Sequence, residues 1–190
     1  DQRQHDFNGN WSAQVGFNYR ETELDGLASE NGFGAPDADG NYNRFSRDRD
    51  YDATYQVFRA EISGSFTTGD IEHRLIAGVD ADEFENDQVA FRDRSTDQFI
   101  NIFNPVYGLS PESGLQLAPQ LDRLETQESL GFYIQDQLSL TEKLDVRIGA
   151  RVDDYEQSLN NRLSGSTSSY SETRVSPQFG VVYKATETLS

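Results

Sequence analysis

The chain of 190 residues contains no cysteine and no methionine. Without thiols it forms no disulfide, no thiolate metal site and no cysteine nucleophile. It also lacks any apolar run approaching the roughly 20 residues that a membrane-spanning helix requires, which excludes a helical membrane protein. Basic residues are scarce, at 16 against 33 acidic ones, and the net charge is -17. This balance argues against nucleic-acid binding, which depends on Lys and Arg to displace phosphate counterions.

The apolar content is also low. Hydrophobic residues make up 35% of the chain and the mean hydropathy is -0.74, values that usually indicate a small core or disorder. A transmembrane β-barrel is an exception, because only every second residue of each strand faces lipid and an average hides that alternation. The low hydropathy is therefore compatible with a membrane protein of this one kind.

A strict alternation of side chains is present from Phe7 to Tyr19, where apolar residues fall on odd positions and polar residues lie between them. A period of two places each set on its own face of a strand, here one toward lipid and one toward a wet lumen. The pattern recurs in five more segments, separated alternately by tight turns and long acidic loops. We predict an all-β fold, an antiparallel up-and-down transmembrane β-barrel of which this chain is a partial one with about six strands. The expected strands cover about 7–20, 51–66, 71–82, 126–140, 144–153 and 172–183, and the expected external loops cover 21–50, 83–125 and 154–171.

The first expected hairpin has a two-residue turn at Thr68-Gly69, which pairs Phe66 with Ile71. Continued along both strands, this register matches apolar with apolar and polar with polar residues. Because a slip of one residue would mix the two faces, the match supports the hairpin.

The second hairpin turns through residues 141–143 and pairs Leu140 with Leu144. It brings Asp136 opposite Ile148 on the apolar face. The cost of a charge on the lipid face fades away from the bilayer midplane, so this position is acceptable near the interface.

Short turns alternate with long loops, as they do in outer-membrane barrels with periplasmic turns and extracellular loops. This alternation gives the sheet an orientation. Trp11, Phe66 and Tyr183 then lie near the periplasmic interface, where aromatic girdles occur.

Five segments resemble one known family, the TonB-dependent siderophore receptors. The motifs occur in the order of the family and lie on the strands and loops that the alternation predicts. They also include Asp136 and Pro177, two residues that fit a lipid-facing strand poorly. The segments are SGSFTTG with HRLIAGVD at 63–69 and 73–80, NIFNPVYG at 101–108, GFYIQDQ at 131–137, GARVD at 149–153 and SPQFGVVY at 176–183.

The resemblance implies a barrel of about 22 strands, plugged by an N-terminal domain, that imports ferric siderophores with energy passed from the inner membrane by TonB. The chain has no recognisable plug, no TonB-contacting segment and no closing strand, so we expect a fragment. Six strands are too few to enclose a lumen, and the fragment alone is not expected to transport.

No catalytic or resident metal site is expected. His5 and His73 each lack a second histidine at ligand spacing, and the acidic triplets lack the residue order of a calcium loop. No serine has an arguable His and Asp partnership. We therefore expect no enzyme and no cofactor, with iron entering only as the ferric-siderophore ligand.

Two sets of side chains are candidates for ligand contact. The first set faces the lumen, where aromatic rings can pack a bulky chelate and an arginine can pair with its anionic donors. The second set lies in the second external loop. Packing against the plug is the alternative for the first set, and a small core within the loop is the alternative for the second. The first set is Arg20, Tyr51, Tyr55, Phe84 and Tyr155, and the second is Phe99, Phe103 and Tyr107.

The expected protein is thus an outer-membrane, TonB-dependent receptor that imports a ferric siderophore. Its expected partners are the siderophore, the TonB system through the plug, and outer-membrane lipid. Two alternatives remain open at this point: a porin-like passive channel, and a soluble extracellular β-rich binding module. The sequence does not name the ligand.

Overall fold

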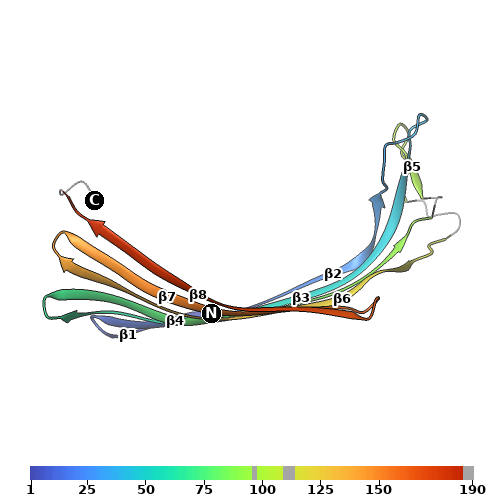
Figure 1. Ribbon diagram of the computed structural model, residues 1–190. Helices are drawn as coiled ribbons and strands as arrows, with labels where there is room; N and C mark the ends of the chain where they lie inside the picture. The colour runs from blue at the N-terminus through green and yellow to red at the C-terminus, as the bar shows by residue number, and fades with distance from the viewer. Residues whose placement is uncertain (96–97, 109–113, 186–190) are drawn as a thin grey trace.

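The computed structural model describes residues 1–95, 98–108 and 114–185, and every regular element within them is a β-strand (Figure 1). None of the described segments forms a helix of the length and apolarity needed to cross a membrane. The all-β prediction is confirmed. The strands are β1 (Gln2–Asn8), β2 (Trp11–Asn31), β3 (Asn41–Thr68), β4 (Ile71–Asp93), β5 (Phe99–Asn101), β6 (Ala118–Thr141), β7 (Leu144–Asn161) and β8 (Ser166–Tyr183).

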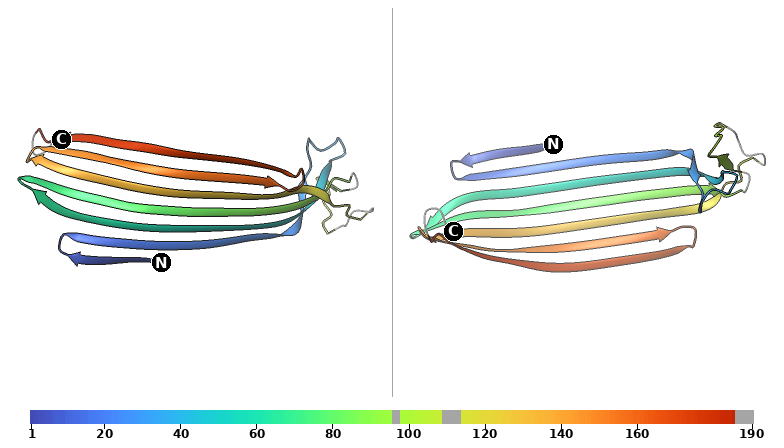
Figure 2. Two further views of the ribbon diagram at one scale, coloured as in Figure 1. Left: turned by 60° about the horizontal axis from the view of Figure 1, so that its bottom comes forward. Right: turned by 90° about the horizontal axis from the view of Figure 1, so that it is seen from above.

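The strands form one antiparallel sheet in the order β1-β2-β3-β4-β6-β7-β8. The short strand β5 is off this path and pairs with residues 41–43 at the start of β3. Figure 2 shows β1 and β8 at opposite edges of the sheet, which is curved but not closed. The up-and-down topology is confirmed, and the open sheet is consistent with part of a larger barrel.

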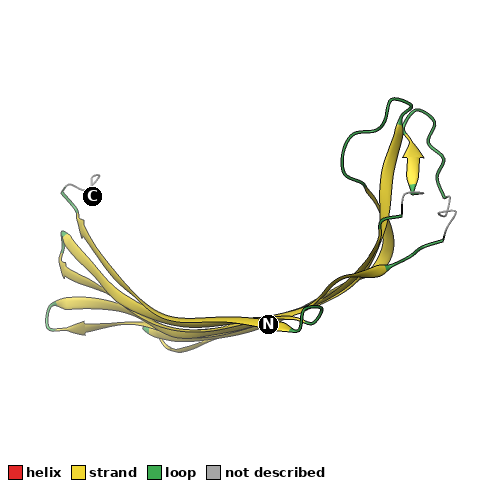
Figure 3. Cartoon of the chain, turned by 45° about the vertical axis from the view of Figure 1, so that its right-hand side comes forward, coloured by secondary structure: helices red, strands yellow, loops and turns green. Residues whose placement is uncertain are grey.

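The sheet forms a trough whose strands bend toward the same side at both ends (Figures 1 and 3). Its two faces differ in polarity. Phe132 and Phe179 on one face are 56% and 76% exposed, whereas Asp80 on the other is 9% exposed. Side chains converge on a concave surface and diverge on a convex one, so this contrast places the polar residues inside the trough. We call the two sides the apolar face, with Val15, Phe17, Phe58, Ile62, Val79, Phe132, Ile134, Val152 and Phe179, and the polar face, with Arg59, Ser63, Asp80, Tyr133 and Arg151.

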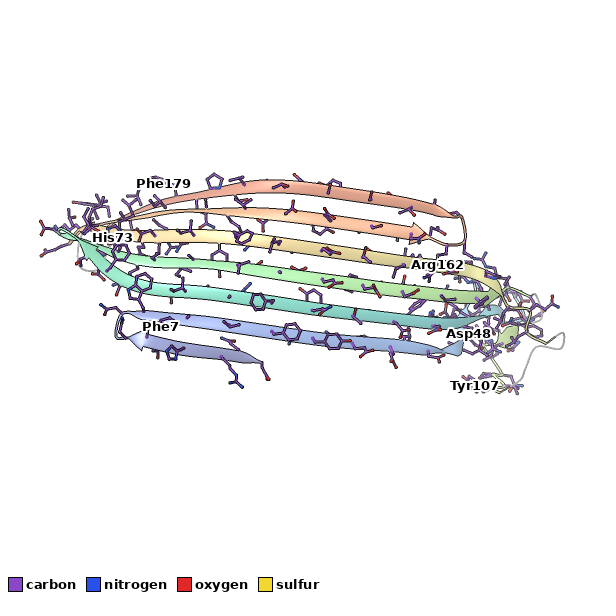
Figure 4. The ribbon with its side chains drawn as sticks, turned by 90° about the horizontal axis from the view of Figure 1, so that it is seen from below. Phe7, Asp48, His73, Tyr107, Arg162 and Phe179 are labelled. Carbon is purple, nitrogen blue, oxygen red and sulfur yellow. The ribbon has the colours of Figure 1, made fainter. Side chains whose placement is uncertain are left out.

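Short turns and long connections lie at opposite ends of the strands. Residues 9–10, 69–70 and 142–143 form the short-turn end, and Gly69 has the positive φ of 61° that tight hairpins favour. Seen from its convex side in Figure 4, the sheet has Phe7 and His73 near the short-turn end, whereas Asp48, Tyr107 and Arg162 lie near the loop end.

The predicted first strand is wrong at its start, because the chain reverses at residues 9–10. The side chain of Asn8 accepts hydrogen bonds from the backbone N–H groups of Asn10 (2.9 Å) and Trp11 (3.1 Å), which is a turn. Residues 2–8 therefore form an additional strand, β1, and the sheet has seven strands where about six were expected. Phe7 and Trp11 are both odd-numbered, so the alternation gave no sign of the reversal.

The predicted external loops 21–50, 83–125 and 154–171 are wrong in extent. Strands β2 and β3 extend into the first loop, to Asn31 and from Asn41, and β4 and β6 extend into the second, to Asp93 and from Ala118. Strands β7 and β8 take up most of the third. The connections that remain are 32–40, 94–117 and 162–165. A strand needs about 9–11 residues to cross a bilayer, whereas β3 has 28 residues. Beyond the lipid both faces are polar, so the ladder continues without an apolar alternation. Residues 96–97 and 109–113 of the second predicted loop lie outside the described residues.

The predicted register of the first hairpin is wrong by two. Thr68 pairs with Ile71 across a turn at 69–70, and Phe66 pairs with His73. A shift of two residues keeps every side chain on its face, so the matching of apolar pairs did not detect it. The register of the second hairpin is confirmed along its strands, where Leu138 pairs with Val146. Its turn is wrong, because a register shift after Ser139 pairs Leu144 with Thr141 and not with Leu140.

Asp136 lies opposite Ile148 on the apolar face, as predicted, and it has a partner there. One oxygen of its carboxylate lies 2.7 Å from Nδ1 of His73. The ring of His73 stacks on Phe66 (centroids 4.6 Å apart), and Phe66 stacks on Trp11 (6.2 Å). This aromatic group at the short-turn end shields the polar pair from lipid, at a depth where a lone charge costs about 0–1 kcal/mol.

The corrected register is testable because the chain has no native cysteine. In the complete protein, Ser65→Cys with Arg74→Cys places the two thiols at directly opposite positions, within disulfide reach, so it is expected to oxidise. Ser65→Cys with Glu72→Cys is diagonal and is expected to remain reduced. Mass spectrometry after thiol alkylation distinguishes the two. Faster oxidation of the second pair would restore the sequence-based register.

Candidate functional site

Three predicted ligand-contact residues lie in one row on the polar face. Arg20 pairs with Tyr55, and Tyr55 pairs with Phe84, across β2, β3 and β4. The rings of Tyr55 and Phe84 meet edge to face, with centroids 6.5 Å apart. Tyr51 lies on the same face, four residues nearer the loop end, opposite Gln88. The structure therefore brings four of the five residues of this set together.

Tyr155 is separated from that row. It pairs with Ser129 of β6 and Glu172 of β8, and its ring lies 6.3 Å from the ring of Tyr170. The sequence analysis missed Tyr170, because it assigned that segment to a loop. No apolar alternation marks that segment, because both faces of its strands are polar, so the sequence carried no signal for it.

The predicted loop residues are exposed. Phe99 in β5 is 56% exposed, and Phe103 and Tyr107 beyond it are 75% and 76% exposed. The ring of Phe103 covers Gly40, where an added Cβ would lie 2.4 Å from the ring. These three rings are therefore exposed at the loop end.

One ring at the loop end is buried, and the sequence analysis missed it. Phe45 on β3 is 7% exposed and stacks on the exposed ring of Phe33 with centroids 6.4 Å apart. Arg47 and Arg92 lie against the ring of Phe45, 5.4 and 4.4 Å from its centroid. Phe45 thus holds two arginines on the polar face just below the loops.

An ion-pair network crosses the middle of the polar face. Arg151 donates two hydrogen bonds to the two carboxylate oxygens of Asp80, both at 2.7 Å, and a third to Asp153 at 2.6 Å. Next to it, the hydroxyl of Tyr133 donates to Glu61 at 2.7 Å. These bonds join β3, β4, β6 and β7, and paired, bidentate contacts of this kind fix geometry as well as adding energy.

Glycines make this network possible. A Cβ at Gly131 would lie 2.1 Å from a guanidinium nitrogen of Arg151, and a Cβ at Gly78 would lie 2.5 Å from the hydroxyl of Tyr133. Each long side chain lies flat across the neighbouring strand where that strand has no side chain. The segments 73–80, 131–137 and 149–153 thus meet in one interlocked group, which the sequence analysis did not anticipate.

No metal centre accompanies these groups. In the part of the chain that the structure describes, no three His, Cys, Asp or Glu side chains are arranged to hold a metal ion. The chemistry available on the polar face is therefore hydrogen bonding, ion pairing and aromatic contact.

The turn between β2 and β3 is held by Asp37. Its carboxylate accepts hydrogen bonds from the side-chain amide of Asn41 (3.0 Å) and from the backbone N–H groups of Asn41 (2.7 Å) and Asp39 (3.0 Å). These bonds, first of all that of the Asn41 side chain, lower the pKa of Asp37 below its ordinary value.

The comparisons with known proteins agree with one another. Residues 2–190 match the family described as TonB-dependent receptor-like, β-barrel. The metal-pseudopaline receptor CntO of Pseudomonas aeruginosa is 31% identical over 195 residues, which cover 96% of this chain and 26% of that protein. The ferrioxamine B receptor of Salmonella typhimurium is 26% identical over 185 residues, covering 95% and 24%. The chain thus spans about a quarter of the length of these curated relatives.

The fold has solved counterparts. The crystal structure of the ferripyoverdine receptor of the outer membrane of Pseudomonas aeruginosa, bound to ferripyoverdine, superposes with a TM-score of 0.76 at 19% identity. The match covers 96% of this chain and 24% of that one. At this identity the likeness concerns the fold alone.

The network predicts a measurable cost at Gly131. In the complete protein, Gly131→Ala is expected to displace the guanidinium of Arg151 and to lower the free energy of unfolding by about 1.5–3 kcal/mol, the usual worth of a hydrogen bond to a charged group. Urea titration in lipid vesicles measures it. Gly16→Ala is the matched control, because a Cβ there has nothing within 4 Å. Equal stability of the two variants would contradict the prediction.

The turn at Asp37 predicts a pH dependence. Because the folded pKa is lowered, its contribution is present above the ordinary carboxyl pKa and is lost as the pH falls through the lower folded value. Protection of the Asn41 amide against hydrogen exchange, corrected for the intrinsic rate, is expected to fall as the pH is lowered below the ordinary carboxyl pKa of about 4. In Asp37→Asn, whose side-chain carbonyl does not titrate, protection should not change over this range.

Proposed function

The chain belongs to the family of TonB-dependent receptor-like β-barrels, and on that premise we propose that it is part of the wall of a receptor that imports a ferric siderophore or a related metal complex. Its place is the Gram-negative outer membrane, where receptors of this fold lie. The names of the relatives support the proposed cargo, since they are receptors for metal-pseudopaline and for ferrioxamine B.

One observation carries the proposal: the two faces of a single sheet differ in polarity over seven antiparallel strands. Large apolar side chains cover the convex face, and paired charges, hydroxyls and aromatic rings cover the concave one. A soluble binding module would bury its apolar face, so the exposed convex face argues against that alternative. No observation favours a passive porin.

The mechanism follows from this arrangement. The complex first meets the external connections, where Phe103 and Tyr107 are exposed, and then reaches the concave face. There the rings of Tyr55 and Phe84 pack against the ligand and Arg20 pairs with anionic donors. Iron is cargo, no bond is made or broken, and the protein is a transporter without enzymatic activity. Energy from TonB reaches this wall through the plug that the family resemblance implies.

Uptake by cells tests the proposed function. Cells that lack other siderophore receptors and express the complete gene are given radioiron as ferrichrome, ferrioxamine B or ferric citrate. Accumulation of at least one complex, abolished when TonB is deleted, is the expected result. Accumulation that persists without TonB would contradict the proposal and indicate a passive channel.

The aromatic row gives a residue-level prediction. Tyr55→Ala and Phe84→Ala are each expected to weaken binding of the transported complex by about ten-fold, since an aromatic contact contributes about 0.5–1.5 kcal/mol beyond its buried area. Equilibrium binding to the purified receptor measures the change. Tyr19→Ala is the matched control, because Tyr19 lies on the neighbouring strand with its side chain on the apolar face. If all three variants bind alike, the row is not part of the ligand site.

A further inference from the structure

Two arginines lie directly opposite each other at the loop end of the polar face. Arg47 of β3 pairs with Arg92 of β4. Arg47 is four residues from Tyr51 on β3, and Arg92 is eight residues from Phe84 on β4. Because side chains alternate with a period of two, both arginines lie on the polar face with Tyr51 and Phe84. Like charges at directly opposite positions of a sheet destabilise it, so the pair requires an explanation.

Phe45 holds both guanidinium groups in place. Its ring centroid lies 5.4 Å from the guanidinium carbon of Arg47 and 4.4 Å from that of Arg92. The ring of Phe45 is itself 7% exposed, and the ring of Phe33 stacks on it at 6.4 Å. Cation–π attraction to one fixed ring makes the two positive groups part of a rigid surface.

The charge of this surface is only partly balanced. Glu30 forms salt bridges with Arg47 (3.3 Å) and with Arg49. No salt bridge or hydrogen bond joins the side chain of Arg92 to a described residue, and the Nε atoms of Arg47 and Arg92 are buried without a partner. The next residue, Asp93, is on the opposite face and accepts hydrogen bonds from the backbone of Ser95 and Gln116. Among the described residues, Glu30 thus forms salt bridges with Arg47 and Arg49 and none with Arg92, in a chain of net charge -17.

We propose that Arg92, with Arg47 beside it, binds a carboxylate group of the imported metal complex, so that the receptor selects anionic chelates. The planar fork of a guanidinium matches the two oxygens of a carboxylate, and a carboxylate between the two arginines relieves their repulsion. A cationic complex is repelled by the positive charges of both arginines. This inference rests on the proposed function and adds the charge class of the ligand to it.

Three iron complexes of different charge test the inference on the purified complete receptor: ferric citrate, which carries carboxylates and is anionic, ferrichrome, which is neutral, and ferrioxamine B, which is cationic. Binding is measured by equilibrium dialysis with radioiron. Ferric citrate is expected to bind most tightly. Arg92→Gln is expected to weaken its binding by roughly 10- to 100-fold, the loss typical of a hydrogen bond to a charged group. Arg92→Lys, which keeps the charge and loses the fork, is expected to weaken it less.

Arg74→Gln is the matched control. Arg74 lies on the same strand and face as Arg92 but at the short-turn end, where its side chain forms a salt bridge with Glu72 at 3.3 Å. Its loss is expected to leave the affinity for ferric citrate unchanged. Assembly of each variant is verified by its heat-dependent mobility on gels.

The outcomes separate the two proposals. Tightest binding of ferrichrome or ferrioxamine B, or an unchanged affinity for ferric citrate in Arg92→Gln, overturns the anionic selectivity and leaves the import function standing. Binding of none of the three complexes overturns both.

Discussion

The pairing of every backbone N–H and C=O group within the bilayer is the constraint on which the structure depends. Hydrocarbon offers no hydrogen-bond partner, so a strand that crosses it needs an uninterrupted ladder on each side. Strand β3 meets this requirement on both sides, with unbroken antiparallel registers to β2 from Arg44 to Gly64 and to β4 from Ser46 to Thr68. Once the ladder is continuous, side chains alternate strictly between two solvents, and the opposite chemistry of the two faces follows. The low mean hydropathy is a direct result, since only one residue in two meets lipid.

The alternation made the fold class predictable, and the limits of that prediction have the same origin. Apolar matching fixes which face a residue occupies, because a slip of one residue exchanges the faces. It does not distinguish registers that differ by two, and the first hairpin was therefore placed two residues from its true register. The second hairpin was right along its strands, but its turn was placed wrongly, because an irregularity after Ser139 leaves no trace in the alternation. Strand ends were missed wherever the strand rises above the lipid, as between Glu83 and Asp93, since both faces are then polar.

The candidate site was predictable only in part, for a similar reason. Parity along one strand places Tyr51 and Tyr55 on the concave face, and the pairing of Tyr55 with Phe84 follows from neighbouring strands. Contacts that join segments far apart in sequence were beyond that reasoning. Asp80 meets Arg151 across 71 residues, a contact that depends on the order of strands in the sheet, which the sequence does not state. Phe45 meets Arg92 within the β3–β4 hairpin, but both lie beyond the predicted ends of its strands, at 51 and 82.

The glycines beneath Tyr133 and Arg151 have a consequence for how this wall can evolve. A glycine in a strand is usually a weak point, with no side chain to pack and more freedom to lose on folding. Here the missing side chain at Gly78 or Gly131 is the space that a longer neighbour occupies. Replacement of either partner is therefore conditional on the other: a larger residue at position 131 becomes tolerable only together with a shorter one at position 151. Each glycine and its long neighbour, on two adjacent strands, are therefore expected to change together.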